Sequence, residues 1–75
     1  MIRVRTKNSV YEFSFTTYKA DGSRHGIVSK NGGSWTECYL FSSIELDSIM
    51  VMMLGPTIGS GIRTTTAVTG IDYIA

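Results

Sequence analysis

The sequence predicts an all-β protein: a small, strongly bent antiparallel sheet, or an SH3-like or OB-like barrel, of five to six short strands. The first observation is a repeat of two residues among the aromatic side chains, which is the period of a β-strand and not of a helix. The second is a series of turn signals that divides the chain into short segments. The third is the lack of a helical stripe of ten or more residues. Six of the eight aromatic residues follow the first pattern, in the runs Tyr11-Phe13-Phe15 and Trp35-Tyr39-Phe41.

Two strands are expected in the first eighteen residues. Ile2–Thr6 alternates aliphatic with basic side chains, and Lys7-Asn8-Ser9 then supplies a turn, because Asn tolerates a left-handed backbone. Val10–Tyr18 alternates aromatic side chains at odd positions with mostly polar ones at even positions. Such alternation is typical of a strand with one face on the core, so we expect its odd residues to point inward, namely Tyr11, Phe13 and Phe15.

Turns and strands continue through the middle of the chain. Ala20–Ser23 contains an Asp-Gly turn signal and precedes an expected strand at His25–Lys30. Asn31-Gly32 is the strongest hairpin signal, because a type I′ turn needs positive φ at both central residues. The next strand is expected at Ser34–Ser42, and Ser43–Ser48 is expected to bend or turn.

The last part of the chain is expected to add two further segments of sheet. Ile49–Leu54 has apolar residues on both faces, which is typical of a central strand. A loop should follow at Gly55–Gly61. The last strand is expected at Ile62–Thr69, and it resumes at Ile71–Ile74 after a bulge or bend at Gly70.

Length and composition limit the class of protein. Seventy-five residues make one domain, residues 1–75. The single cysteine, Cys38, excludes an internal disulfide scaffold and favours a reducing, cytoplasmic setting. The start, Met1–Arg5, has no apolar stretch that would indicate a signal peptide. The longest apolar run, Ile49–Leu54, is far too short to span a membrane.

The charge is small in sum and uneven in distribution. A net charge of +1 gives no strong non-specific attraction to nucleic acid. Residues 1–30 carry six basic residues (Lys or Arg) and two acidic ones, whereas residues 31–75 carry one basic residue and four acidic ones. Such a mixture keeps a small domain soluble. The alternative interpretation is a bipolar surface that offers one basic face to a phosphate or to an acidic protein partner.

No catalytic or metal-binding set is recognisable, so we expect neither enzyme activity nor a cofactor. The only histidine, His25, is expected to face solvent beside the Asp21-Gly22 turn, without a catalytic partner. Zinc sites need several Cys or His ligands, and the chain has one of each. Cys38 lies within an expected strand, and free cysteines are usually buried.

The glycine-rich loop leaves two interpretations open. It lacks the Lys and the following helix of a phosphate-binding loop. Its backbone amides could still form an anion-binding nest in front of Arg63, at Gly59, Ser60 and Gly61. The alternative is a plain connection between two strands.

The strand expected at Ser34–Ser42 has two possible orientations. Its odd residues are Trp35, Glu37, Tyr39 and Phe41, and its even residues include Thr36, Cys38 and Leu40. With the odd set inward, each buried ring contributes roughly 2–3 kcal/mol, but Glu37 is buried as well, which is costly without a partner. With the even set inward, the odd set forms an exposed aromatic patch, and such patches mark binding sites. We favour a partly exposed odd set and keep the odd-inward core as the alternative.

An exposed odd set would serve one of two kinds of binding. The first is binding of a protein partner or of a second copy of the chain, because Trp, Tyr and Phe dominate protein–protein hot spots and Met adds adaptable contact area. The residues for this use are Trp35, Glu37, Tyr39, Phe41, Met50 and Met52. The second is binding of a nucleotide or nucleic acid, in which rings stack on bases and cations meet phosphates. The cations for this use are Arg3, Arg5, Lys7 and Arg63.

Two segments of the chain, Asn8-Ser9-Val10-Tyr11-Glu12-Phe13 and Arg63-Thr64-Thr65-Thr66 leading to Val68 and Ile71, resemble short all-β proteins of phages and mobile elements. The resemblance implies a phage accessory protein in the cytoplasm of a bacterial host, including a small inhibitor of a bacterial defence system. It carries over no catalytic residue. The sequence thus favours a non-catalytic module that binds a host protein or itself, with nucleic-acid or nucleotide binding by a small β-barrel as the alternative.

Overall fold

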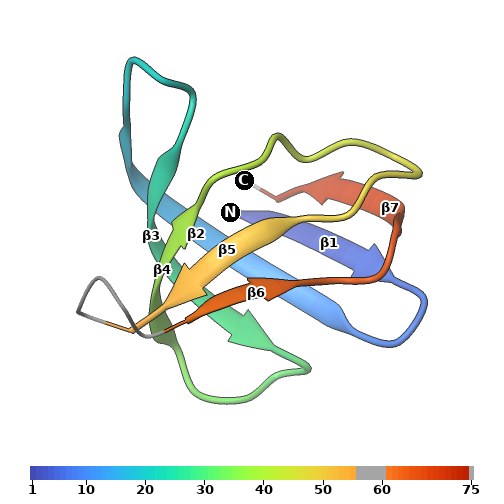
Figure 1. Ribbon diagram of the computed structural model, residues 1–75. Helices are drawn as coiled ribbons and strands as arrows, with labels where there is room; N and C mark the ends of the chain where they lie inside the picture. The colour runs from blue at the N-terminus through green and yellow to red at the C-terminus, as the bar shows by residue number, and fades with distance from the viewer. Residues whose placement is uncertain (56–60, 75) are drawn as a thin grey trace.

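The computed structural model describes residues 1–55 and 61–74, which form a single antiparallel sheet in the spatial order β6-β5-β4-β3-β2-β1-β7 (Figure 1). The all-β prediction is confirmed, and in this part of the chain no helix is long and apolar enough to cross a membrane. The strands are β1 Ile2–Thr6, β2 Val10–Tyr18, β3 Arg24–Lys30, β4 Thr36–Leu40, β5 Val51–Leu54, β6 Ile62–Thr64 and β7 Val68–Tyr73.

The sheet is strongly curled, into a half-barrel (Figure 1). Its two edge strands, β6 and β7, are consecutive in the chain and are joined only by residues 65–67. In a flat sheet of this many strands the edges would lie ~29 Å apart, whereas so short a connection reaches at most ~14 Å. The sheet therefore has to curl until its edges approach each other.

Backbone hydrogen bonds fix the corner between β6 and β7. Val68 N donates to Ser48 O at 3.0 Å, and Asp47 N donates to Val68 O at 2.9 Å. Thr65 N donates to Met50 O at 3.1 Å, and the Thr65 hydroxyl accepts a bond from Met50 N at 3.0 Å. The segment before β5 is thus attached to both ends of the connection.

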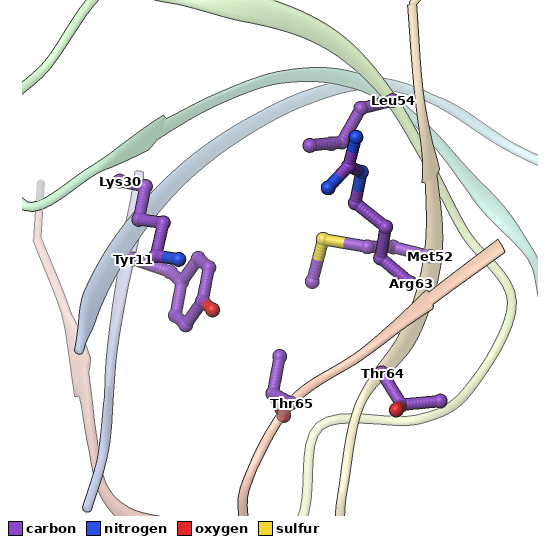
Figure 2. A pocket seen from close by; sticks show the side chains of 7 residues that line it. All are labelled: Tyr11, Lys30, Met52, Leu54, Arg63, Thr64 and Thr65. Atoms are coloured by element: carbon purple, nitrogen blue, oxygen red, sulfur yellow. The ribbon is translucent and has the colours of Figure 1, made fainter. Parts of the chain in front are cut away.

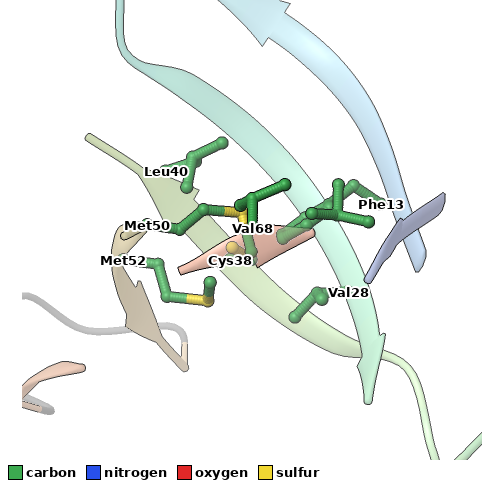
Figure 3. Packing of buried hydrophobic residues seen from close by; sticks show 8 residues of the cluster. Phe13, Val28, Cys38, Leu40, Met50, Met52 and Val68 are labelled. Carbon is green, nitrogen blue, oxygen red and sulfur yellow. The ribbon is translucent and has the colours of Figure 1, made fainter. Parts of the chain in front are cut away.

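The concave side of the curled sheet holds the core (Figure 3). Every strand but β6 contributes to it, directly or through a partly buried side chain. The prediction for β2 is confirmed, because Phe13 is fully buried and Tyr11 and Phe15 pack against the cluster. The buried hydrophobic cluster consists of Val4, Phe13, Val28, Cys38, Leu40, Met50, Met52 and Val68.

The C-terminal segment forms two strands where the sequence predicted one with a late interruption. The chain leaves the sheet after Thr64 and returns at Val68, since this is where it crosses from one edge to the other. β7 then runs through Gly70 without ending. A register shift opposite Arg5 and Thr6 leaves Thr69 without a paired residue, so a bulge does lie beside Gly70.

The Asn31-Gly32 turn has the predicted conformation, with φ of 52° and 74°. Gly33 N donates to Lys30 O at 3.0 Å and closes the turn, but the β3–β4 ladder starts only at Val28 and Thr36, so the hairpin is not a tight two-residue one. Asn31 N donates to Val10 O at 2.7 Å, and the Asn31 side-chain oxygen accepts a bond from Val10 N at 2.8 Å. β4 consequently begins at Thr36, later than the expected Ser34.

A bulge in β2 makes Gly26 essential to the close packing of two strands. The register shifts between Phe15 and Thr17, so Thr16 has no paired residue in β3. A Cβ atom on Gly26 would overlap Ser14 O and lie 2.7 Å from Phe15 Cα. These are backbone atoms, which cannot rotate away as a side chain can.

We therefore predict that Gly26→Ala lowers the free energy of unfolding by about 3 kcal/mol, because overpacking against backbone forces the strands apart. The matched control is Gly33→Ala, whose added Cβ would meet a single carbonyl oxygen at 3.1 Å. Urea unfolding of both variants measures the difference. Equal stability of the two would contradict the close approach seen at Gly26.

Candidate functional site

Of the aromatic residues that the sequence singled out, Tyr39 belongs to β4, and Trp35 and Phe41 directly precede and follow this strand. Cys38 and Leu40 are fully buried, whereas Trp35 and Phe41 are each 47% exposed. Phe41 N donates to Val51 O at 2.9 Å, which extends the alternation one residue beyond the strand. The favoured orientation, with even residues inward and the odd set partly exposed, is therefore the one that the structure shows.

Glu37, the acid among these rings, has a partner on the neighbouring strand. Its Oε1 lies 2.8 Å from His25 Nε2, and the side chains are 36% and 29% exposed. His25 lies directly opposite Tyr39, and their rings stack with centroids 4.3 Å apart at 15°. The expectation that His25 is a solvent-facing turn residue without a partner was wrong, because the pairing of β3 with β4 places it beside Glu37 and Tyr39.

The cluster has a defined polar centre within an apolar surface. In the neutral tautomer with hydrogen on Nε2, His25 donates a hydrogen bond to Glu37; protonated, it forms an ion pair with it. Lys19 Nζ lies 5.6 Å from the Tyr39 ring centroid. Ile27, directly opposite Glu37 in the ladder, is 42% exposed. We define the β4 face as Ile27, Trp35, Glu37, Tyr39 and Phe41.

The methionines of the predicted protein-binding set do not belong to this face. Met50 is fully buried and Met52 is 2% exposed, so the expectation that they add contact area at the surface was wrong. Met52 lies opposite Leu40 and shares its inward side, and Met50 joins the same core cluster. β5 is apolar on both sides because it lies inside the sheet, between β4 and β6.

The predicted nucleic-acid cations are not brought together into one track. On β1, Arg3 forms an ion pair with Glu12 at 3.2 Å, and Arg5 pairs with Asp72 at 3.5 Å. Lys7 lies in the exposed turn after β1. Arg63 belongs to β6, at the other edge in the strand order. It faces inward opposite Met52, so it shares no surface with the β1 arginines.

The predicted anion-binding nest lies mostly outside the described residues. Gly59 and Ser60 belong to the segment 56–60, and only Gly61 is described. Gly61 has a φ of +94° and is exposed. The nest therefore stays a prediction.

A cavity of about 340 Å³ opens on the inner side of the sheet, between β2–β3 and β5–β6 (Figure 2). The sequence analysis named Arg63 and Met52 for two different uses, and it did not single out Lys30 as a site residue. The spacing could have indicated that Lys30 faces inward, because it follows Val28 by two residues and therefore lies on the same side of β3. What brings these segments together is the curl of the sheet. The lining residues are Tyr11, Lys30, Met52, Leu54, Arg63, Thr64 and Thr65.

The described residues hold no gathered set of titratable groups for metal binding. No three His, Cys, Asp or Glu side chains in residues 1–55 and 61–74 lie close enough to share a cation. Cys38 faces the core and His25 faces outward, so these two cannot act as a nucleophile and its base. Absence of enzyme activity stays a prediction.

Comparisons with protein-family models, with curated proteins and with solved structures find no match. The likeness to phage proteins is accordingly untested. Function has to be inferred from the residues of this chain.

Burial raises the pKa of the Cys38 thiol from 9.0 to about 11. Because the thiolate is the reactive species, we predict that a disulfide reagent labels Cys38 slowly in the folded protein at pH 8 and rapidly in urea. The raised pKa also means that the thiol's contribution to stability is present below about pH 9 and is lost as the pH rises toward 11. Rapid labelling of folded protein would contradict the burial of Cys38.

The pair of His25 and Glu37 should orient the β4 face more than it stabilises the fold, since both side chains are partly exposed. We predict a coupling energy of about 1 kcal/mol or less in a double-mutant cycle of His25→Ala and Glu37→Ala. Chemical unfolding of the four proteins measures it. A coupling of several kcal/mol would show instead that the pair is a buried structural element.

Proposed function

We propose that the protein is a non-catalytic protein-binding module and that the β4 face is its contact surface. The observation that carries this proposal is the orientation of β4: Cys38 and Leu40 fill the core, whereas Trp35 and Phe41, which flank the strand, remain about half exposed. Such rings are costly to leave in water unless a partner covers them. Their residue types are those that dominate protein–protein hot spots.

The polar centre of the β4 face supports the same proposal. Protein interfaces combine an apolar core with a few fixed hydrogen-bonding groups. Here Glu37 is held by His25, which in turn stacks on Tyr39, so the polar atoms are already positioned before a partner arrives. Positioned side chains lose less conformational entropy on binding than mobile ones.

Nucleic-acid binding is less well supported. A single-strand binding surface combines stacking rings with a groove of cations along the backbone path. The β4 face has Lys19 at its margin but Glu37 at its centre. Arg3 and Arg5, which were expected to serve this use, are paired with carboxylates of the neighbouring strands, Glu12 on β2 and Asp72 on β7.

The partner would be a host protein, as the resemblance to phage accessory proteins implies, or a second copy of this chain. Sedimentation of the purified protein over a range of concentrations separates these two. A mass that stays that of one chain favours a host protein, whereas a dimer that dissociates in Trp35→Ala favours the second copy.

We predict that the double variant Trp35→Ala/Phe41→Ala binds the partner at least about tenfold more weakly than the unmodified protein, as expected for hot-spot aromatics. Each substitution should lower stability by only about 1 kcal/mol or less, because the rings are half exposed. The matched control is Tyr73→Ala, which removes a ring that is 77% exposed on edge strand β7.

Affinity capture from cells of the source organism, quantified for the three proteins, provides the measurement. A partner retained by the unmodified protein and by Tyr73→Ala, and lost by the double variant, is then purified and its affinity measured. If every captured protein is retained equally by the double variant, the β4 face is not the contact surface. If the double variant unfolds, the aromatics are structural and the proposal fails.

A further inference from the structure

The inner cavity between β2–β3 and β5–β6 has a chemistry different from that of the β4 face (Figure 2). We propose that this cavity binds a small phosphate monoester with a planar or apolar body, of the size of a mononucleotide. The two surfaces lie on opposite sides of the sheet and share no residue. This second proposal is therefore independent of protein binding by the β4 face.

The charge of the cavity is positive. Its lining contains two cations, Lys30 and Arg63, and no acidic residue. None of the ion pairs formed within the described part of the chain includes either cation. Two cations without a lining carboxylate match the double negative charge of a phosphate monoester better than the single charge of a carboxylate.

The two cations approach the cavity from opposite walls. Figure 2 shows Lys30 with Tyr11 on one wall, and Arg63 with Met52 on the other. Lys30 Nζ lies 5.9 Å from the centroid of the Tyr11 ring, a cation–π contact that holds the ammonium group over the ring. Arg63 is positioned by its place opposite Met52 in the ladder. An anion between the walls would be contacted from both sides.

The remaining lining suits an apolar or planar body. Met52, which is 2% exposed, and the half-buried Leu54 supply an apolar wall, and a methionine side chain adapts its shape to a flat ring. The cavity volume of about 340 Å³ lies within the usual range for small-molecule sites, roughly 300–1,000 Å³. It is too small for a folded partner.

Three residues of the lining carry a hydroxyl group, Tyr11, Thr64 and Thr65, and that of Thr65 has a structural role. The Thr65 hydroxyl donates to Thr66 O at 2.8 Å and accepts from Met50 N at 3.0 Å, so it holds the corner of the fold. Figure 2 shows the Tyr11 hydroxyl directed into the gap between the walls, with Thr64 at its margin. The Tyr11 hydroxyl can therefore select among ligand bodies by hydrogen bonding.

NMR titration of isotope-labelled protein with adenosine, guanosine, cytidine and uridine 5′-monophosphates tests the proposal. We expect at least one of them to shift the amide signals of Lys30, Leu54 and Thr64 in a saturable manner. The same nucleoside without phosphate, and inorganic phosphate alone, should each bind at least about tenfold more weakly, because each engages only one part of the cavity.

Arg63→Gln and Lys30→Gln should each weaken binding of that monophosphate by about tenfold or more, as expected when a charged hydrogen bond is lost. The matched control is Arg3→Gln, which removes the same charge from the outer side of β1 and should change the affinity by less than about twofold. Both cavity cations are exposed, so the variants should fold. Thermal unfolding checks that they do.

Three results would overturn the proposal. One is the absence of saturable shifts with all four monophosphates at 10 mM, a concentration about tenfold above a millimolar dissociation constant. Another is equal binding of the nucleoside or of inorganic phosphate, which would show that the two parts of the cavity do not act together. The third is tighter binding of a single-stranded oligonucleotide that Arg3→Gln weakens as much as Arg63→Gln, which would indicate an extended nucleic-acid surface.

Discussion

The rest of the structure depends on the short connection between β6 and β7. These strands are the opposite edges of the sheet, yet residues 65–67 alone join them. The sheet can satisfy this connection only by curling, and the curl creates an inside and an outside. The hydrogen bonds of Val68 with Asp47 and Ser48 hold the corner in place and, because backbone bonds need partners at fixed positions, they also fix where the sheet turns.

Curling requires places where strands can bend. Bulges at Thr16 in β2 and at Thr69 in β7 supply two of them, since an extra residue in one strand increases its local twist. Gly26 allows the chain to pass close to the bend in β2, where a Cβ atom would meet backbone. These local features explain how a chain with few buried residues still forms a continuous core around Phe13 and Leu40.

The two candidate sites follow from the two sides of the same sheet. On the outer side, exposed rings surround the paired side chains of His25 and Glu37, which suits a protein partner. On the inner side, Lys30 and Arg63 line a small cavity with an apolar wall, suited to a small anion. The two sites lie on opposite sides because alternate side chains of a strand point to opposite faces. In β5, for example, Met52 lines the cavity while Met53 points to the outer side beside Tyr39.

The sequence by itself determined most of the strands, since the period of two and the turn residues are local properties, but it did not separate β6 from β7. It placed β2 with Phe13 inward, the Asn31-Gly32 turn and the partly exposed odd residues of β4. It could not pair His25 with Glu37, assign Met50 and Met52 to the core, or place Lys30 and Arg63 on opposite walls of one cavity. Those contacts join residues that are distant in the chain or depend on strand register. Only the tertiary structure decided them, because register and curl arise from the packing of all seven strands together.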